Sequence, residues 1–305
     1  MAIKVSTGRL AGAVASEGGI GLIAGSGFSD EDLRTEIGIA REIAKGGIVG
    51  INTLVAASRF IGVMRAACEI GIDLLVAGAG FSRELFELGR KYSVPVVPIV
   101  STARLATLAE NLGASAVIVE GKEAGGHLGT TKSSRVLYPL VKEAVKIPVI
   151  IAGGITDHED LLEVLNMHVD GVQVGTRFAA SHECNASPEF KNRYLEAKQG
   201  DVFKIHSPVG LPGNALMTPF YERVLAGQIT PPPCDGCLKR CSRSYCIVRA
   251  LIKAQEGNLE EGLVFAGEHV YKIREILSVK EIFRLFFDGL EFIDPSPTTP
   301  GGTPS

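Results

Sequence analysis

The chain has 305 residues, a formal net charge of −3 and 46% hydrophobic residues, with a mean hydropathy of +0.22. This composition suits a globular protein, and it lacks the basic excess that nucleic acids and anionic membranes attract. The apolar runs are strand-sized, far short of the roughly 20 residues of a membrane helix, and no export signal is apparent after Met1. We therefore expect a cytoplasmic protein with a small-molecule substrate and without a nucleic-acid or membrane partner.

From Gly18 to about Tyr194 one unit repeats, a short apolar run followed by an amphipathic stretch. Continuous Val, Ile and Leu residues indicate parallel strands that are buried on both faces. The predicted strands are Gly19–Ala24, Ile48–Leu54, Asp73–Ala79, Val94–Val100, Ala116–Gly121, Pro148–Gly154 and Gly171–Phe178. The helices predicted between them include Asp30–Lys45, Ser58–Ile70, Thr102–Leu112, Ser133–Lys146 and Asp157–Met167. Several of these begin with Ser, Thr or Asp, which are common N-cap residues.

Alternating strands and helices predict a parallel α/β sheet. The predicted strands fit either an open doubly wound sheet or an eight-stranded barrel that lacks one strand. Polar and glycine residues follow most of the strands, at Asn52, Gly78–Gly80, Glu120–Gly121, Gly153–Gly154 and Gly175–Thr176. Because ligand sites in barrels lie where the strands end, this wide distribution favours a barrel of the TIM (β/α)8 type.

The repeat ends after Tyr194, and a stretch rich in Pro and Gly leads to further helices. We predict an α/β barrel over residues 1–200 and a mostly helical C-terminal region over residues 201–294. Residues 295–305 consist of Pro, Gly, Thr and Ser without a hydrophobic residue, and we expect a disordered tail there.

Two consecutive strand ends carry glycine with a nearby hydroxyl residue. Gly153 and Gly154 follow one strand, and Gly175 and Thr176 follow the next. In barrels a phosphate group often binds between the last two strand ends, where backbone N–H groups can approach its oxygens. The alternative is that these glycines only form tight turns. The presence of two such sites favours phosphate binding.

One histidine lies in a glycine-rich loop at the same edge of the predicted barrel. His127 follows Glu120 and the run from Gly125 to Gly126. Imidazole titrates near neutral pH and can reach a ligand from such a loop. The alternative is a histidine with only a surface or packing role. We predict instead that His127 is a general acid or base.

Four of the six cysteines lie close together, at Cys234, Cys237, Cys241 and Cys246. Four thiolates at the spacing C-x2-C-x3-C-x4-C can bind one Zn²⁺ ion or a [4Fe–4S] cluster. The alternative is a group of reduced structural cysteines. We predict a metal centre at this segment.

These motifs, in this order, resemble the nitronate monooxygenase family, formerly the 2-nitropropane dioxygenases, which includes flavin-dependent enoyl-acyl-carrier-protein (enoyl-ACP) reductases. Val119–Gly129 resembles the Glu-Ala-Gly-Gly-His signature of that family. Gly153–Ile155 and Gln173–Phe178 resemble its FMN phosphate strands, and the similarity extends from Met1 to about Leu290.

The resemblance implies a TIM barrel that holds FMN under a smaller helical domain, in a homodimer. It implies that His127 is the catalytic residue. It also implies the cofactor-binding positions Asn52, Glu120, Gly125, Gly153, Gly154, Gln173, Val174, Gly175 and Thr176. Glu120 departs from the Gln that is common in the monooxygenases. The family's first strand ends in Gln-Gly-Gly-Met or a similar motif, and Met1 falls on its Met. We hypothesise that the chain begins at an internal methionine and lacks the first strand of the barrel.

By this resemblance, the expected activity is FMN-dependent oxidation of nitronates or nitroalkanes by O2 to a carbonyl compound and nitrite. The first alternative is an enoyl-thioester (enoyl-ACP) reductase that uses FMN and NAD(P)H. The second is a barrel that binds a phosphorylated ligand without flavin.

Overall fold

The computed structural model describes residues 3–78 and 80–290, so the predicted tail at residues 295–305 lies outside the described residues. A parallel sheet of seven strands forms the centre of the fold, in the order β1-β2-β3-β4-β5-β7-β8. The strands are β1 (Gly21–Ala24), β2 (Val49–Leu54), β3 (Leu74–Gly78), β4 (Val96–Val100), β5 (Val117–Glu120), β7 (Val149–Ala152) and β8 (Gly171–Gln173). Every predicted strand is present, and the curled sheet with its helices confirms the barrel-type α/β fold.

The helices alternate with the strands, as the sequence predicts. They are α1 (Gly8–Ser16), α2 (Asp30–Ala44), α3 (Phe60–Ile70), α4 (Arg83–Tyr92), α5 (Ala103–Asn111), α6 (Ser134–Ala144), α7 (His158–Leu165) and α8 (Thr176–Ala179). The side chains of Ser29, Thr102, Ser133 and Asp157 each accept a hydrogen bond from a backbone N–H of the first turn of the helix that follows. These caps satisfy donors that have no partner within the helix and so fix where α2, α5, α6 and α7 begin.

One strand boundary differs from the prediction. The last predicted strand extends to Phe178, but β8 ends at Gln173 and α8 begins at Thr176, with Gly175 as its N-cap residue. Phe178 is nevertheless buried, because its ring packs against Phe283 and Phe286 of the last helix. A buried apolar residue has the same sequence signal in a strand and in a short helix.

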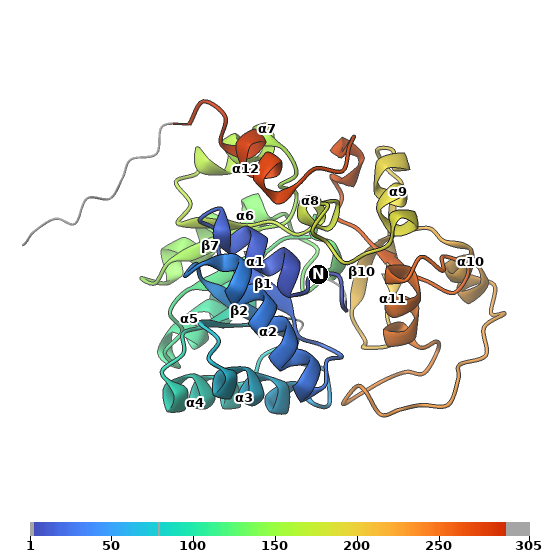
Figure 1. Ribbon diagram of the computed structural model, residues 1–305, viewed down its shortest axis with the longest axis horizontal. Helices are drawn as coiled ribbons and strands as arrows, with labels where there is room; N and C mark the ends of the chain where they lie inside the picture. The colour runs from blue at the N-terminus through green and yellow to red at the C-terminus, as the bar shows by residue number, and fades with distance from the viewer. Residues whose placement is uncertain (1–2, 79, 291–305) are drawn as a thin grey trace, which may run out of the picture.

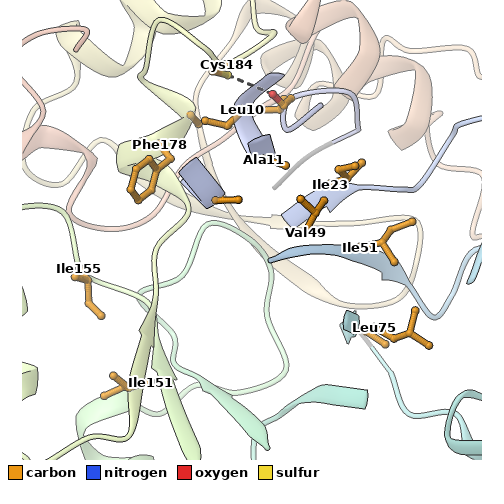
Figure 2. Packing of buried hydrophobic residues seen from close by; sticks show 14 of the residues in the cluster. Leu10, Ala11, Ile23, Val49, Ile51, Leu75, Ile151, Ile155, Phe178 and Cys184 are labelled. Atoms are coloured by element: carbon orange, nitrogen blue, oxygen red, sulfur yellow. Dashed lines mark hydrogen bonds between the residues drawn. The ribbon is translucent and has the colours of Figure 1, made fainter. Parts of the chain in front are cut away.

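The barrel core lies between the sheet and the surrounding helices. Ile23, Ile51 and Leu75 occupy β1, β2 and β3 and are each fully buried (Figure 2). Helix α1 packs closely on β1, because a Cβ atom at Gly21 would lie 1.8 Å from the backbone oxygen of Ala11. Only glycine allows this approach of helix and strand.

The sheet has two edge strands, β1 and β8, and the described residues show no ladder between them. The segment before α1 lies along β1, where the backbone N–H of Ala24 donates to the carbonyl oxygen of Ser6 over 2.8 Å. From the other side, the Cys184 thiol donates to the carbonyl oxygen of Val5 over 3.4 Å (Figure 2). Residues 5 and 6 therefore connect β1 to the chain that follows β8, at the position of the expected missing strand.

A second, smaller unit follows the barrel, and we call residues 202–265 the cap. The elements after α8 are α9 (Pro188–Glu196), β9 (Val202–His206), β10 (Pro212–Leu216), α10 (Pro219–Leu225), α11 (Ile247–Gln255), β11 (Val264–Phe265), the 3-10 helix η1 (Val270–Lys272) and α12 (Val279–Phe287). Figure 1 shows α9, α10 and α11 together on one side of the barrel, whereas α12 returns to the barrel beside α7.

An antiparallel sheet, which sequence analysis did not predict, joins the cap to the barrel. Strand β10 pairs with β9, with β11 and with β6 (Gly126–His127), and β6 comes from the loop that follows β5. The cap has its own hydrophobic core, which includes Ile205, Tyr221 and Tyr245. The barrel loop with His127 is therefore a strand of the cap sheet.

Candidate active site

A cavity of about 710 Å³ lies where the barrel strands end, between the barrel and the cap. This volume is in the range of sites for cofactors and drug-sized ligands. The predicted site residues that line it are Asn52, Glu120, Gly125, His127, Gly153, Gly154, Gln173, Gly175 and Thr176. Val174 is not among its lining residues, and its side chain packs against the barrel core. The structure thus brings together residues that lie far apart in the sequence.

The first predicted glycine pair has a backbone that other residues cannot adopt easily. Gly153 and Gly154 have φ angles of +99° and +66°. A Cβ atom at Gly154 would also lie 3.0 Å from Nη1 of Arg135. The Arg135 guanidinium donates to the carbonyl oxygens of both glycines, over 2.6 and 2.9 Å. Arg135 therefore holds this loop from behind while the glycines line the cavity.

The second predicted glycine lies above open space. A Cβ atom at Gly175 would meet no atom within 4 Å, and the residue begins the short helix α8. The first N–H groups of a helix have no partner inside it and attract anions. The Thr176 hydroxyl oxygen accepts a hydrogen bond from the backbone N–H of Gly267 over 3.1 Å, which leaves its own hydrogen free to be donated. Both glycine sites therefore face the cavity, where a phosphate site was predicted.

Among the described residues, three that line the cavity have a buried side-chain atom without a hydrogen-bond partner. These atoms are Oε1 of Gln173, Oγ1 of Thr53 and Nδ1 of His269. Leaving a buried polar atom without a hydrogen bond costs about 1–3 kcal/mol, so such atoms commonly face a ligand or an ordered water molecule. Thr53 was not predicted, and only its position beside Asn52 at a strand end could have indicated it.

Glu120 ends β5 and lines the cavity. Burial raises the pKa of its carboxyl group from 4.5 to about 7. The residue as a whole is half-buried, and its exposed part lines the cavity. A carboxyl group in this environment is partly protonated at neutral pH and can then donate a hydrogen bond, as the amide of a glutamine would.

His127 faces the cavity from β6. Its Nε2 atom lies 2.8 Å from Oγ of Ser207, and its ring packs edge-on against Phe265 with 5.1 Å between the ring centroids. Burial lowers the pKa of His127 from 6.5 to about 4, so its imidazole is neutral at pH 7. In the tautomer in which Nε2–H donates to Ser207, Nδ1 carries no hydrogen and can accept a proton.

The position of the His127 loop depends on a buried asparagine that sequence analysis missed. Asn214 on β10 is 1% exposed, and its Nδ2 donates to the carbonyl oxygens of Lys122 and Ala124 over 2.7 and 2.8 Å. Backbone pairing of Gly213 with His127 extends the same contact. No sequence motif marks Asn214, because its role appears only when β10 and the loop meet.

Asp160, His269 and Lys272 form a charged cluster at the edge of the cavity. Asp160 is 4% exposed and accepts from Lys272 over 2.7 Å and from the backbone N–H of Thr156 over 2.9 Å. Nδ1 of His269 lies 3.2 Å from the same carboxylate without the alignment of a hydrogen bond, and the contact is an ion pair when the imidazole is protonated. Burial alone would raise the pKa of Asp160, but His269 and Lys272 outweigh it and lower that pKa. His269 lines the cavity, although no sequence motif marks it.

The four clustered cysteines lie in the long connection between α10 and α11, and Cys237 lines the cavity. All four are free thiols. Among residues 3–78 and 80–290, no three His, Cys, Asp or Glu side chains are arranged to hold a metal ion in this conformation. The metal centre at Cys234, Cys237, Cys241 and Cys246 therefore stays a prediction. Within the same ranges, no helix has the length and the apolar character to span a membrane.

Several known proteins are similar to this chain. The family model "Nitronate monooxygenase" matches residues 1–287. A probable nitronate monooxygenase of Bacillus subtilis (strain 168) is 28% identical over 61% of the chain and 55% of its own length.

A second curated relative carries a different name. The (3aS,4S,5R,7aS)-5-hydroxy-7a-methyl-1-oxo-octahydro-1H-indene-4-carboxyl-CoA dehydrogenase of Rhodococcus jostii (strain RHA1) is 30% identical over 69% of the chain. The chain spans 59% of the length of that relative. Among solved structures, FabK from Thermotoga maritima superposes with a TM-score of 0.83 at 30% identity, covering 93% of this chain and 88% of its own.

Proposed function

Because this chain belongs to the nitronate monooxygenase family, an oxidoreductase family, we propose that it oxidises nitronates or nitroalkanes with bound FMN and O2. The products would be a carbonyl compound and nitrite. The observation that carries the proposal is the meeting in one cavity of the two glycine sites, the unpartnered Oε1 of Gln173 and the neutral imidazole of His127.

The residues present fit FMN. Gly153, Gly154, Gly175 and Thr176 offer backbone and hydroxyl donors to a phosphate group. The buried Oε1 atom of Gln173 has no partner among the described residues and could accept a hydrogen bond from an N–H group on the edge of the flavin ring. When bound, FMN supplies the electron-accepting chemistry that no protein side chain provides.

His127 is the proposed base. Burial keeps its imidazole in the neutral form at pH 7, and this is the form that can take the proton from the carbon beside a nitro group. Ser207 fixes one ring nitrogen, and the packing of Phe265 fixes the plane of the ring. With a preformed nitronate no proton has to be removed, and His127 then only orients the anion.

The second candidate is an enoyl-thioester reductase that uses FMN and NAD(P)H. One observation favours it: the cap side of the cavity is largely apolar, with Leu238, Ile247, Val248 and Leu251 among its lining residues. Such a wall suits an acyl chain, and one curated relative is named for a CoA thioester. The same imidazole would then donate or orient a proton.

Spectra and product analysis of the purified full chain test these alternatives. We expect a yellow protein whose flavin is reduced anaerobically by a nitronate, with nitrite formed in air. His127→Asn should slow turnover of a neutral nitroalkane by about 10²–10⁴-fold, and turnover of the preformed nitronate much less.

Two other results would redirect the assignment. Flavin bleaching by NAD(P)H, followed by reoxidation with a crotonyl-type thioester and not by nitronate turnover, would favour the reductase. A colourless protein that takes up no FMN on reconstitution would contradict both flavin proposals and favour a flavin-free phosphate-binding barrel.

A further inference from the structure

The connection between α10 and α11, residues 226–246, is long and irregular. It contains no helix or strand, and an isolated β-bridge joins its Leu238 to Ala57. Connections of more than about 12–15 residues without secondary structure are uncommon in compact proteins and are usually functional or disordered. This one is held in place, since the backbone N–H of Ser58 donates to the carbonyl oxygen of Cys237 over 3.0 Å.

The middle of this connection has little apolar surface of its own, whereas Ile229 and Tyr245 near its ends pack in the cap core. Between Pro231 and Ser244, Leu238 is the only large aliphatic or aromatic side chain. A segment with so few apolar residues cannot gain enough from burial to offset the entropy of ordering its chain. Small units of this kind depend on disulfides or a bound metal. Because the cysteines here are free thiols, a disulfide does not provide the link in this structure.

Two of the cysteines lie in turns of the same form. The Sγ atom of Cys234 accepts from the backbone N–H of Gly236, and that of Cys241 accepts from the backbone N–H of Arg243, each over 3.4 Å. Gly236 and Arg243 have φ angles of +65° and +59°. This left-handed conformation is unusual for arginine and persists only when its surroundings impose it. Backbone N–H groups aimed at sulfur stabilise the thiolate form, which is the form that binds metals.

The other two cysteines lie a few positions after these turns along the chain. The carbonyl oxygen of Cys237 accepts from the backbone N–H of Ser58 on the barrel side. Cys246 directly precedes α11, where Arg249 pairs with Asp235 over 3.0 Å and so ties the first turn to this helix. The segment also carries Lys239, Arg240 and Arg243, whose positive charges would offset those of several thiolates.

We propose that Cys234, Cys237, Cys241 and Cys246 together bind a metal centre through four thiolates, either one Zn²⁺ ion or one [4Fe–4S] cluster. In the described conformation the four thiols do not surround a single point. Metal binding would therefore draw the two turns together and order the connection, as happens when a metal site forms together with its fold. Cys237 and Leu238 line the cavity, so the same event would fix that part of its wall.

Elemental analysis of the full chain tests the proposal. The protein is purified without oxygen and without an affinity tag that binds metals, and its zinc, iron and acid-labile sulfide are measured. We expect about one zinc per chain, or about four iron and four sulfide per chain. Cys237→Ser and Cys241→Ser should each lower the bound metal at least about tenfold. Cys68→Ala, which removes a buried thiol of α3, should retain it.

A second measurement keeps the test valid if a serine variant folds poorly. Chelator treatment of the unmodified chain should speed trypsin cleavage after Lys239, Arg240 and Arg243, while cleavage in the barrel stays unchanged. The proposal is overturned if the metal content is the same in the serine variants and the unmodified chain. It is also overturned if the unmodified chain holds no metal after incubation with Zn²⁺ or with Fe²⁺ and sulfide, or if mass analysis finds the four cysteines in disulfides. None of these readouts depends on flavin or activity.

Discussion

The raised pKa of Glu120 predicts how the free energy of unfolding changes with pH. Burial raises the pKa of this carboxyl group from 4.5 to about 7 in the folded protein. Between these values the unfolded chain loses its proton while the folded chain keeps it, so rising pH favours unfolding. A difference of about 2.5 pKa units corresponds to about 3 kcal/mol at about 1.4 kcal/mol per unit. Because the carboxyl group partly faces the cavity, we expect a loss of about 2 kcal/mol between about pH 5 and about pH 8.

The Glu120→Gln variant isolates this contribution, since glutamine is neutral at every pH and has nearly the same shape. Urea unfolding of the apoprotein at several pH values gives the free energy of unfolding for both chains. The difference between the two profiles should change by about 2 kcal/mol over this range, in favour of the variant at higher pH. Glu87→Gln, on the exposed face of α4, should give a profile parallel to that of the unmodified chain. Parallel profiles for Glu120→Gln would refute the reasoning.

Three further predictions concern the surroundings of the cavity. Asp160→Asn removes one partner of buried ion pairs and should lower the free energy of unfolding by about 3 kcal/mol in urea titrations; an unchanged midpoint would contradict this. Gly154→Ala should weaken FMN binding by about 10–100-fold in a flavin fluorescence titration, through loss of well-placed N–H donors. Gly71→Ala, at an equally left-handed glycine with open space around it, should leave binding intact. Asn214→Ala should lower kcat by an amount close to that of the His127 variant, with FMN affinity retained; a normal kcat would show that the loop holds its position without it.

The barrel strands were predictable because burial on both faces leaves a simple signal. Continuous Val, Ile and Leu runs cannot alternate with polar residues, and each of the predicted runs contains a strand of the sheet. Their ends were less certain, since Phe178 is as apolar as a strand residue although it lies in α8. The cap sheet could not be predicted, because β6 has only two residues and pairs with β10, which lies far along the chain.

The same division applies to the site. Gly153, Gly154 and Gly175 could be singled out because they follow two consecutive strands, and they do line the cavity. Asn214 and His269 were missed because neither residue type stands out locally. Their roles come from contacts with loops and helices far away in the sequence, which only tertiary packing creates.

His127 belongs to two parts of the molecule at once, since it comes from a barrel loop and is hydrogen-bonded into the cap through β10. A hinge that lifted the cap to admit a substrate would carry the imidazole along with it. The proposed proton acceptor would then be absent from the open state, and closure would bring it to the carbon it must deprotonate. Entry of substrate and assembly of the reactive arrangement would then be coupled through the pairing of β6 with β10.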